Sequence, residues 1–220
     1  MPTTFSEPPG LPDTTSVGTT GNDTFNGGSL LGIDGGTGID TVTYSGTKAS
    51  YAIAKTSTGY TVAGFDLINV ERLQFSDAKV ALDISGNPNT GFDLAGIANA
   101  GQVYRLYQAA FDRAPDKIGL AYWIGQADST VPLVNIAGQF MTSSVEFSSK
   151  YGNLGNHAFV DQLYQNVLHR VGEPNGVAYW YGQIDGGVQT RAQILTGFAE
   201  STENQVAVIG VIQNGIDYTT

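Results

Sequence analysis

The octapeptide GLAYWIGQ (Gly119–Gln126) returns, little changed, as GVAYWYGQ (Gly176–Gln183). The chain has two tryptophans, and each octapeptide holds one of them at the same place. The offset of 57 residues continues on both sides, and twelve of the twenty-six positions aligned over residues 103–128 are identical. Self-similarity at a fixed period is typical of a repeated structural unit. We therefore predict that the second half of the chain is an internally duplicated module.

Apolar residues ahead of each octapeptide recur with the spacing of a helix. The first copy follows the i, i+3, i+4, i+7, i+8 pattern of one helical face with Val103, Leu106, Tyr107, Ala110 and Phe111. Residues 160–168 repeat this pattern. Each copy is predicted to contain a long helix, a turn, a second helix with the Tyr-Trp pair, a third helix and a short further helix. The serines of SSVEF and STEN suit the N-cap of that last helix.

The Tyr-Trp pairs support two interpretations. In the favoured one, a large aromatic side chain wedges the second helix against the first and buries roughly 150–250 Å² per ring. In the other, one member of each pair stays exposed and stacks on sugar rings, because neighbours on a helix point about 100° apart. The residues that carry either role are Tyr122, Trp123, Tyr179, Trp180 and Tyr181.

The first half of the chain has a β pattern. Residues 1–17 hold four prolines among Thr, Ser and Gly, and we predict a disordered leader there. Short alternating runs rich in β-branched and aromatic residues predict a β-meander within 18–84. Residues 85–99 combine Gly, Pro and Asn and are predicted to be a linker, which leaves 100–220 to the duplicated helices. The predicted fold class is α+β in two parts, a small N-terminal β segment and an all-α domain.

Two glycine-rich nonapeptides open the β segment. GGTGIDTVT (Gly35–Thr43) fits the pattern G-G-x-G-x-D-x-U-x, where U is apolar, and GTTGNDTFN (Gly18–Asn26) fits it except at the second glycine. In such turns the glycines adopt positive φ and expose carbonyl oxygens, the aspartate supplies an anionic oxygen and the apolar residue fills the interior. Stacked turns of a β-roll lie about two nonapeptides apart, and Asp23 and Asp40 are seventeen residues apart.

These features predict a calcium site between the two turns, with a degenerate turn on the opposite side of the coil. Ca²⁺ prefers oxygen ligands of this kind. The predicted site residues are Gly18, Gly21, Asp23, Gly35, Gly36, Gly38 and Asp40. The alternative is a glycine-rich start of the sheet that binds no metal.

The composition excludes several classes of partner. Charged residues make up 14% of the chain, and twenty acids against ten bases give a net charge of −10. Such a field repels phosphate groups, so we expect neither nucleic acid nor an anionic membrane surface as partner. The absence of cysteine excludes a disulfide framework. The start has no signal-peptide pattern and no apolar run approaches the roughly 20 residues of a membrane span, so no membrane insertion is expected.

Motifs for catalysis are scarce. Neither G-x-S-x-G nor H-E-x-x-H occurs, and His157 and His169 are the two histidines. We expect structural or solvent-exposed roles for both.

The turn after the first helix of each copy carries an acid and an arginine in register. Asp116 and Glu173 are predicted to lie at helix starts, where the helix dipole favours negative charge. Arg113 and Arg170 are predicted to bond turn carbonyls or these acids. FDRAPDKIG faintly resembles a calcium loop through Asp112, Asp116 and Gly119, but the required bidentate acid is missing.

Two resemblances to known families follow from these stretches. Residues 18–83 resemble the calcium-binding repeats-in-toxin (RTX) family of bacterial type I secreted proteins, through the two nonapeptides and INVERLQFSDAKVALDI. Residues 100–216 resemble the DUF4214 family of helical repeats, through LYQAAFDRAPDKIGLAYW, LYQNVLHRVGEPNGVAYW and GFAESTEN. These resemblances imply RTX-like turns in the β segment, Ca²⁺ as the bound ion, secretion without an N-terminal signal peptide, and an extracellular or cell-surface place. The resemblance to DUF4214 points to a family with no assigned catalytic activity.

Three functional hypotheses remain. The favoured one is a non-catalytic, secreted calcium-binding protein of the cell surface or extracellular matrix, acting in adhesion or S-layer-like self-assembly. Its partner would be itself, in a homo-oligomer or lattice, because a surface low in charge and rich in Thr, Ser and Asn suits packing against copies. The second is a lectin-like module that binds cell-surface glycans through the paired aromatics. An enzyme with an unrecognised site ranks last.

Overall fold

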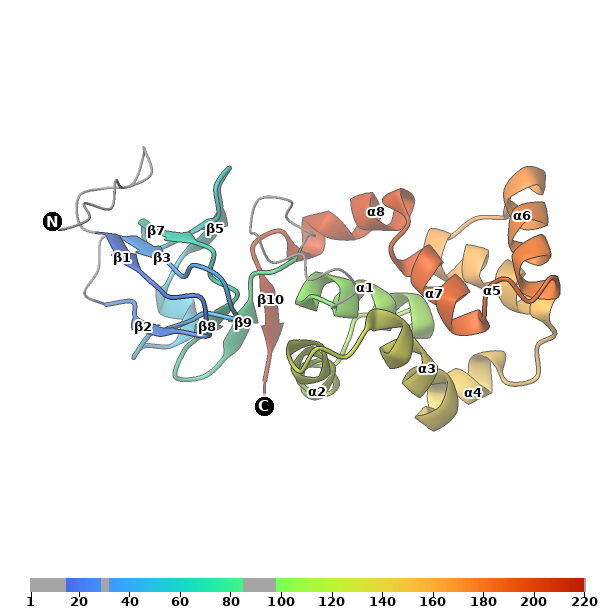
Figure 1. Cartoon of the computed structure of the whole chain (residues 1–220), viewed down its shortest axis with the longest axis horizontal. Helices are drawn as coiled ribbons and strands as arrows, with labels where there is room; N and C mark the ends of the chain where they lie inside the picture. Colours follow the sequence, from blue (N-terminus) through green and yellow to red (C-terminus); the bar gives the residue numbers. More distant parts are fainter. Residues whose placement is uncertain (1–14, 29–31, 85–97, 220) are drawn as a thin grey trace, which may run out of the picture. The chain divides into compact units, whose positions relative to one another are not determined.

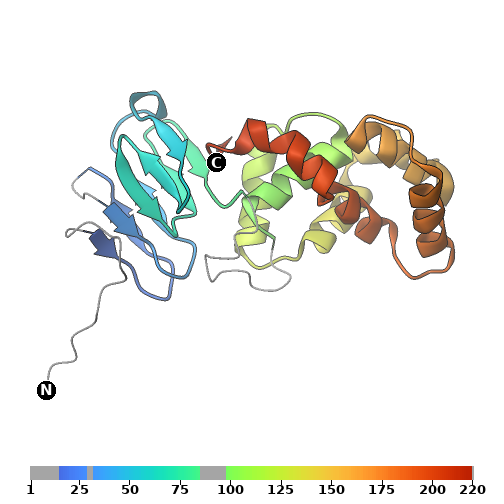
Figure 2. The ribbon, with the colours of Figure 1, turned by 90° about the horizontal axis from the view of Figure 1, so that it is seen from above.

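The protein is described by a computed structural model that covers residues 15–28, 32–84 and 98–219. Its chain divides into two compact units (Figures 1 and 2). The strands coloured blue to cyan, with the red strand β10, form a β unit, and the helices coloured green to red form a helical unit.

The β unit comes first along the chain and the helical unit second, except that a short segment near the C-terminus belongs to the β unit. Within the described residues, the β unit comprises residues 15–83 together with Asn214–Asp217, and the helical unit is built mainly from residues 98–213. An N-terminal β region followed by an all-helical region confirms the predicted α+β fold class.

The first strands of the β unit wind as a two-sheet coil. One sheet pairs three strands in parallel, which are β1 (Thr15–Val17), β3 (Gly32–Asp34) and β7 (Phe65–Ile68). The other sheet pairs β2 (Thr24–Asn26), β4 (Thr41–Thr43) and β8 (Arg72–Gln74), also in parallel. From β1 to β4 the chain therefore crosses from one sheet to the other after each strand. Thr24 pairs with Thr41, so the first two layers are seventeen residues apart, as a stack of coiled turns requires.

Further strands complete both sheets. The first sheet has the order β1-β3-β7-β6-β5 and adds β5 (Ile53–Lys55) and β6 (Tyr60–Val62) in antiparallel pairing. The second has the order β10-β9-β8-β4-β2 and adds β9 (Lys79–Ala81) and β10 (Ile216–Tyr218). The predicted meander is thus right for β5-β6-β7 and β8-β9 and wrong for the parallel pairs, whose partners are distant in sequence.

The predicted domain limits differ from the structure at two places. Residues 15–17 of the predicted leader form strand β1, because their backbone pairs with β3; residues 1–14 lie outside the described residues. The helical domain was predicted to reach residue 220, whereas residues 214–217 belong to the β unit. Most of the predicted linker, 85–97, also lies outside the described residues, and Asn99 caps the first helix.

Apolar side chains of both sheets form the core of the β unit. Val42, which occupies the apolar slot of the complete nonapeptide, is fully buried, and Phe25 of the other nonapeptide packs against the same core. The remaining core side chains include Ile33, Val62, Leu67, Leu73, Phe75 and Val80.

The helical unit contains four helices from each copy. The first copy forms α1 (Ala100–Phe111), α2 (Lys117–Asp128), α3 (Leu133–Ser143) and α4 (Val145–Tyr151). The second forms α5 (Asn156–Leu168), α6 (Pro174–Asp185), α7 (Arg191–Ala199) and α8 (Thr202–Ile212). Ser144 and Ser201 cap α4 and α8, as predicted.

The two copies pack through their first and third helices. Helix α1 contacts α5 and α7, and α3 contacts α7. Arg105 on α1 is buried, with both Nε and Nη2 2.7 Å from the Glu200 carboxylate and Nη1 2.9 Å from the carbonyl oxygen of Ile84. A buried arginine is stable only when its charge and donors are matched in this way. The helices that the structure describes are all too short or too polar to cross a membrane.

Candidate metal site and aromatic faces

The two predicted calcium turns lie in adjacent layers of the coil. The backbone N–H of Asp23 donates to Asp40 Oδ1 at 2.7 Å, and Ile39 N–H donates to Asn22 Oδ1 at 2.9 Å. Asp23 Oδ2 accepts hydrogen bonds from the backbone N–H and hydroxyl of Thr19, at 2.6 and 2.8 Å. The structure therefore brings together the two aspartates that the sequence places seventeen residues apart.

Glycines allow the two layers to approach closely. Gly36 and Gly38 have φ of +90° and +139°, a conformation that other residues rarely adopt. At four positions a Cβ would strike a carbonyl oxygen of the neighbouring layer: Gly18 (2.1 Å from Gly35 O), Gly35 (2.0 Å from Asn69 O), Gly36 (2.4 Å from Thr19 O) and Gly38 (2.6 Å from Gly21 O). Gly21 differs, since the nearest atom to its Cβ position is 4.0 Å away. Packing thus explains the glycine at these four predicted positions but not at Gly21.

A third layer lies above the second, and the two nonapeptides do not include it. It consists of residues 69–71, between β7 and β8. Gly35 N–H donates to Ile68 O at 2.9 Å, and Asp40 N–H donates to Glu71 Oε2 at 2.9 Å. Glu71 is therefore a member of the acidic group that sequence reasoning missed. The signal available was its place in the INVERLQF stretch, directly before a strand.

The acidic group is rich in acceptors, and Asp40 at its centre is buried. Asp40 is 0% exposed, and its Oδ2 has no hydrogen-bond partner. Burial raises the pKa of Asp40, and the hydrogen bond from Asp23 N–H opposes that rise. Burial raises the pKa of Glu71 to about 7; the hydrogen bond from Asp40 opposes the rise, and the charges of Asp83 and Asp40 add to it. Such a site favours any positive charge that can reach it.

The donor set fits a hard cation such as calcium. Within the described ranges no three His, Cys, Asp or Glu side chains form a metal cage, so backbone oxygens would have to supply much of the shell. They are present, because the carbonyl oxygens of Thr19, Gly21 and Gly35 lie between the layers. Carboxylate and carbonyl oxygens together are the ligands that Ca²⁺ prefers.

The second-helix aromatics of each copy divide into an anchor and an exposed ring. Trp123 packs edge-on against Phe140 of α3, with centroids 4.8 Å apart, and Trp180 packs against Phe198 of α7 at 5.2 Å. Tyr122 and Tyr179 are 56% and 53% exposed and rest on the adjacent tryptophan. The tryptophans thus pack the second helix on the third, and Trp180 also hydrogen-bonds Tyr164 of α5, the first helix of its copy.

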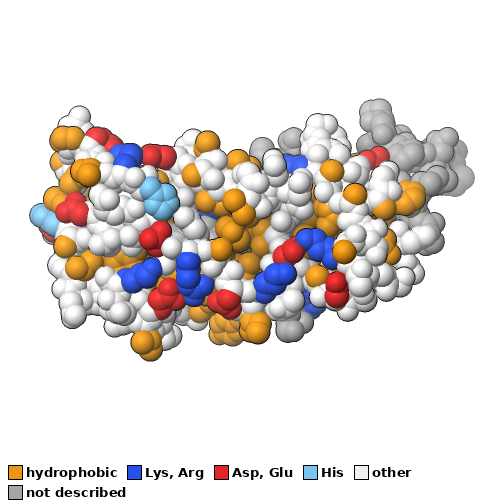
Figure 3. All heavy atoms as spheres, turned by 180° about the vertical axis from the view of Figure 1, so that it is seen from behind, with side chains coloured by type: hydrophobic (Ala, Val, Ile, Leu, Met, Phe, Trp, Pro, Cys, Tyr) orange, Lys and Arg blue, Asp and Glu red, His pale blue; other side chains and the backbone are white. Residues whose placement is uncertain are grey.

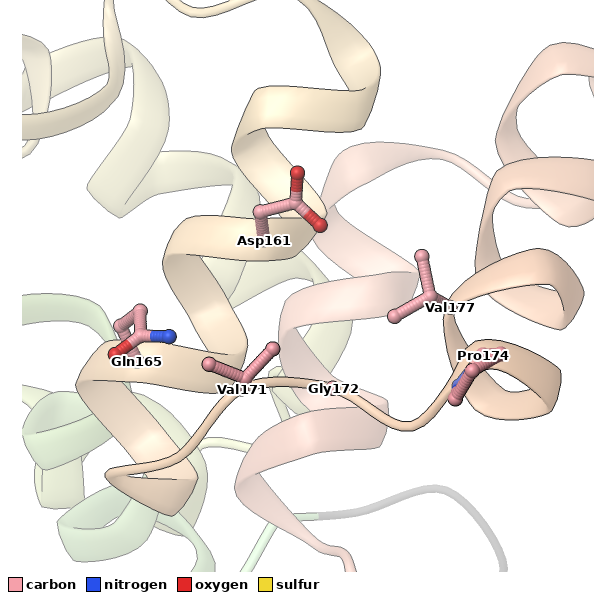
Figure 4. A pocket seen from close by; sticks show the side chains of 6 residues that line it. All are labelled: Asp161, Gln165, Val171, Gly172, Pro174 and Val177. Atoms are coloured by element: carbon pink, nitrogen blue, oxygen red, sulfur yellow. The ribbon is translucent and has the colours of Figure 1, made fainter.

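Tyr181 belongs to a different environment. Its hydroxyl donates to Asp161 at 2.7 Å, its ring stacks on His157 at 3.7 Å, and His157 Nε2 lies 2.6 Å from Asp185. Asp161 also lines a cavity of about 310 Å³ between α5 and the start of α6 (Figure 4). The other lining residues are Gln165, Val171, Gly172, Pro174 and Val177. Tyr181 is therefore engaged within the fold, unlike Tyr122 and Tyr179.

The acids and histidine of the two turns have structural roles. Asp112 and His169 are the left-handed C-cap residues of α1 and α5, with φ of 51° and 52°. Asp116 caps α2 by accepting Gly119 N–H at 2.7 Å, and Glu173 precedes α6 at the equivalent position. Both acids lie at a helix start, as predicted, and Asp112 serves as a helix cap rather than as part of a calcium loop.

Each turn is held by an arginine clamp in register. Arg113 donates to the carbonyl of Ala114 at 3.1 Å and to both oxygens of Glu146 at 3.1 and 2.9 Å. Arg170 repeats this with Val171 at 3.2 Å and with Glu203, both of whose contacts are 2.8 Å. The turn carbonyls and the turn acids were predicted as partners, and Arg170 does donate to Glu173 at 2.6 Å, whereas Glu146 and Glu203 were missed. The 57-residue offset between the two glutamates is the signal that could have identified them.

We expect the glycines of the turn stack to differ sharply in how far substitution by alanine lowers the stability of the β unit. Gly36→Ala forces a Cβ against Thr19 O at an unfavourable φ, so it should destabilise the β unit by at least about 2 kcal/mol. Gly21→Ala meets open space and should change stability by no more than about 0.5 kcal/mol. Scanning calorimetry of both variants measures the difference. Equal melting temperatures for the two variants would contradict this packing of the layers.

Comparison with known proteins gives one result. The sequence model of the family described as "Domain of unknown function (DUF4214)" matches residues 91–144 and 137–208, more than half of the chain. No curated protein and no solved structure matches. The matched region contains the duplicated helices, the arginine clamps and the Tyr-Trp pairs. The chain belongs to the DUF4214 family.

Proposed function

We propose that this protein is a non-catalytic, secreted calcium-binding component of the cell surface or extracellular matrix. The observation that carries the proposal is Asp40, a fully buried aspartate whose Oδ2 has no partner inside a stack of carbonyl-lined turns. A buried polar atom without a partner is rare and costly in a folded protein. A bound cation would supply the missing partner.

Asp23, Asp40 and the carbonyl oxygens of the stacked turns would hold calcium. The ion would supply a positive charge that offsets the mutual repulsion of the two acids. The protein's own part is to fix the oxygens, through glycines that bring the layers together and strands that set their register. Extracellular modules bind calcium weakly enough to respond to its concentration outside the cell, which agrees with the proposed location.

Adhesion or lattice-like self-assembly is the role that the surface supports best. Charged residues are only 14% of the chain, and on the face in Figure 3 most of the surface is neither charged nor hydrophobic. Isolated apolar side chains such as Ile118, Val145 and Val206 are well exposed on three different helices. Such a surface opposes association with copies of itself less than a highly charged one would.

Calcium is expected to raise the melting temperature of the β unit. At a concentration about 100 times the Kd the linkage is about 2.7 kcal/mol, equivalent to roughly 10–20 °C for a unit of this size. Calorimetry with calcium, with magnesium and with a chelator measures the shift. Both tryptophans lie in the helical unit, so their emission follows the unfolding of that unit. A calorimetric transition that calcium shifts without a matching shift in emission then belongs to the β unit. Asp40→Asn should abolish the shift; a melting temperature indifferent to calcium would contradict the proposal.

Sedimentation velocity of the same samples tests the assembly role. Calcium-dependent growth to larger species is the expected result. A strictly monomeric protein, with and without calcium, would contradict self-assembly while leaving calcium binding standing.

Glycan binding is a second candidate function, favoured by the repeated exposed tyrosines. Each ring is held edge-on by a tryptophan, which fixes its orientation. Gly125 and Gly182 follow one helical turn later, and a Cβ at either would meet nothing within 4 Å. A helical glycine costs about 1 kcal/mol relative to alanine, so packing within the chain gives no reason for either. Both leave open space beside the ring, where a flat sugar face fits.

The double variant Tyr122→Ala/Tyr179→Ala tests this candidate. Affinity electrophoresis through a panel of neutral polysaccharides should retard the parent protein, and the variant should bind at least about tenfold more weakly. The control is Val206→Ala/Val211→Ala, which removes exposed apolar side chains from α8 and should leave retardation unchanged. A parent protein that no polysaccharide retards, or a variant that binds as the parent does, would contradict glycan binding.

A further inference from the structure

The third layer of the turn stack repeats the geometry of the layers below it. The Cβ position of Gly18 lies 2.1 Å from Gly35 O and 3.0 Å from Asp23 Oδ2. In the next gap, the Cβ position of Gly35 lies 2.0 Å from Asn69 O and 2.5 Å from Asp40 Oδ2. Asn69 thus takes the place of Gly35 one layer up, and its φ of +50° gives it the left-handed conformation. Each gap therefore brings one carboxylate oxygen and one carbonyl oxygen together.

The two gaps differ in how those oxygens are satisfied. In the lower gap Asp23 Oδ2 accepts two hydrogen bonds from Thr19. In the upper gap Asp40 Oδ2 is buried and has no partner. The carboxylate of Glu71 reaches the same residue, since Glu71 Oε2 accepts the backbone N–H of Asp40 at 2.9 Å, as Asp40 Oδ1 accepts that of Asp23 one layer below. Two carboxylates and a carbonyl oxygen therefore border the upper gap, and one of the carboxylate oxygens, Asp40 Oδ2, lacks a hydrogen-bond donor.

The neighbouring acids and the arginine are already engaged. Asp34 Oδ1 accepts hydrogen bonds from Gly36 N–H at 3.1 Å and from Asn69 Nδ2 at 2.8 Å. Arg72 Nη1 lies 2.5 Å from Asp83 and 2.7 Å from the carbonyl oxygen of Glu71. The guanidinium of Arg72 thus donates to the backbone carbonyl oxygen of Glu71. Asp40 and Glu71 are the carboxylates best placed to hold a further ligand.

We propose that the upper gap is a second calcium position and that Glu71 is one of its ligands. The ion would be held by Asp40 Oδ2, the carbonyl oxygen of Asn69 and the carboxylate of Glu71, with water completing the shell. This inference rests on the proposed calcium function and adds a ligand from outside the two nonapeptides. If Glu71 is a ligand, calcium links the turn of Asp40 to the β7–β8 connection, which forms the last layer of the parallel coil.

Calcium titration of the full chain by calorimetry separates the two gaps. Glu71→Gln keeps the size and the acceptor for Asp40 N–H but removes the charge; it should bind one calcium ion fewer, or bind calcium at least about tenfold more weakly. Asp23→Asn, the matched control, changes the lower gap and should retain the ion that Glu71 binds. Calorimetric unfolding of the β unit confirms folding of each variant.

The outcomes distinguish this inference from the function on which it rests. If the parent binds calcium and Glu71→Gln binds it equally well, Glu71 is no ligand and the inference is overturned, while calcium binding stands. If the parent binds no calcium, both fail. Should Glu71→Gln not fold, ¹³C spectra of the glutamate carboxyls in the parent decide. The Glu71 signal should shift with calcium while that of Glu200, paired with Arg105, stays in place; an unmoved Glu71 signal would overturn the inference.

Discussion

The hydrogen bond from the Asp23 amide to the buried Asp40 carboxylate joins two layers of the coil at the point where the acidic side chains meet. Most strands of this coil are three residues long, so each pair contributes only a few ladder hydrogen bonds. The turns add close contact: glycine at four positions allows a carbonyl oxygen of the next layer to occupy the space of a side chain. The same closeness buries acids without fully satisfying them, which links the stability of this unit to positive charge.

The helical unit is stabilised in a different way. Its buried Arg105 pairs with Glu200, and the two turn arginines pair with Glu146 and Glu203. Duplication places each clamp and each tryptophan at equivalent positions, so Tyr122 and Tyr179 rest on equivalent neighbours. In the proposed function the helical unit supplies the contact surface and the β unit responds to calcium.

The sequence predicted most of this architecture because its signals are local or periodic. The 57-residue offset predicted eight helices, and the nonapeptides predicted stacked turns with Asp23 near Asp40. The parallel pairs β3–β7 and β4–β8 were missed because strands of three or four residues carry little alternation and their partners lie about thirty residues away along the chain. Glu71 was missed for the same reason, since only tertiary contact brings it to Asp40. The strand β10 was missed because a short C-terminal segment contains no signal of the sheet that it joins.

Amide hydrogen exchange of Asp23, measured by NMR with and without calcium, tests the central claim most directly. An amide in an exposed glycine-rich loop exchanges fast, whereas one bonded to a buried carboxylate exchanges only when the layers open. The account predicts that the Asp23 amide is protected to the level of the sheet amides of β4, and that calcium slows its exchange further. Exchange at the rate of an open loop, unchanged by calcium, would contradict the stacked layers and the cation site together.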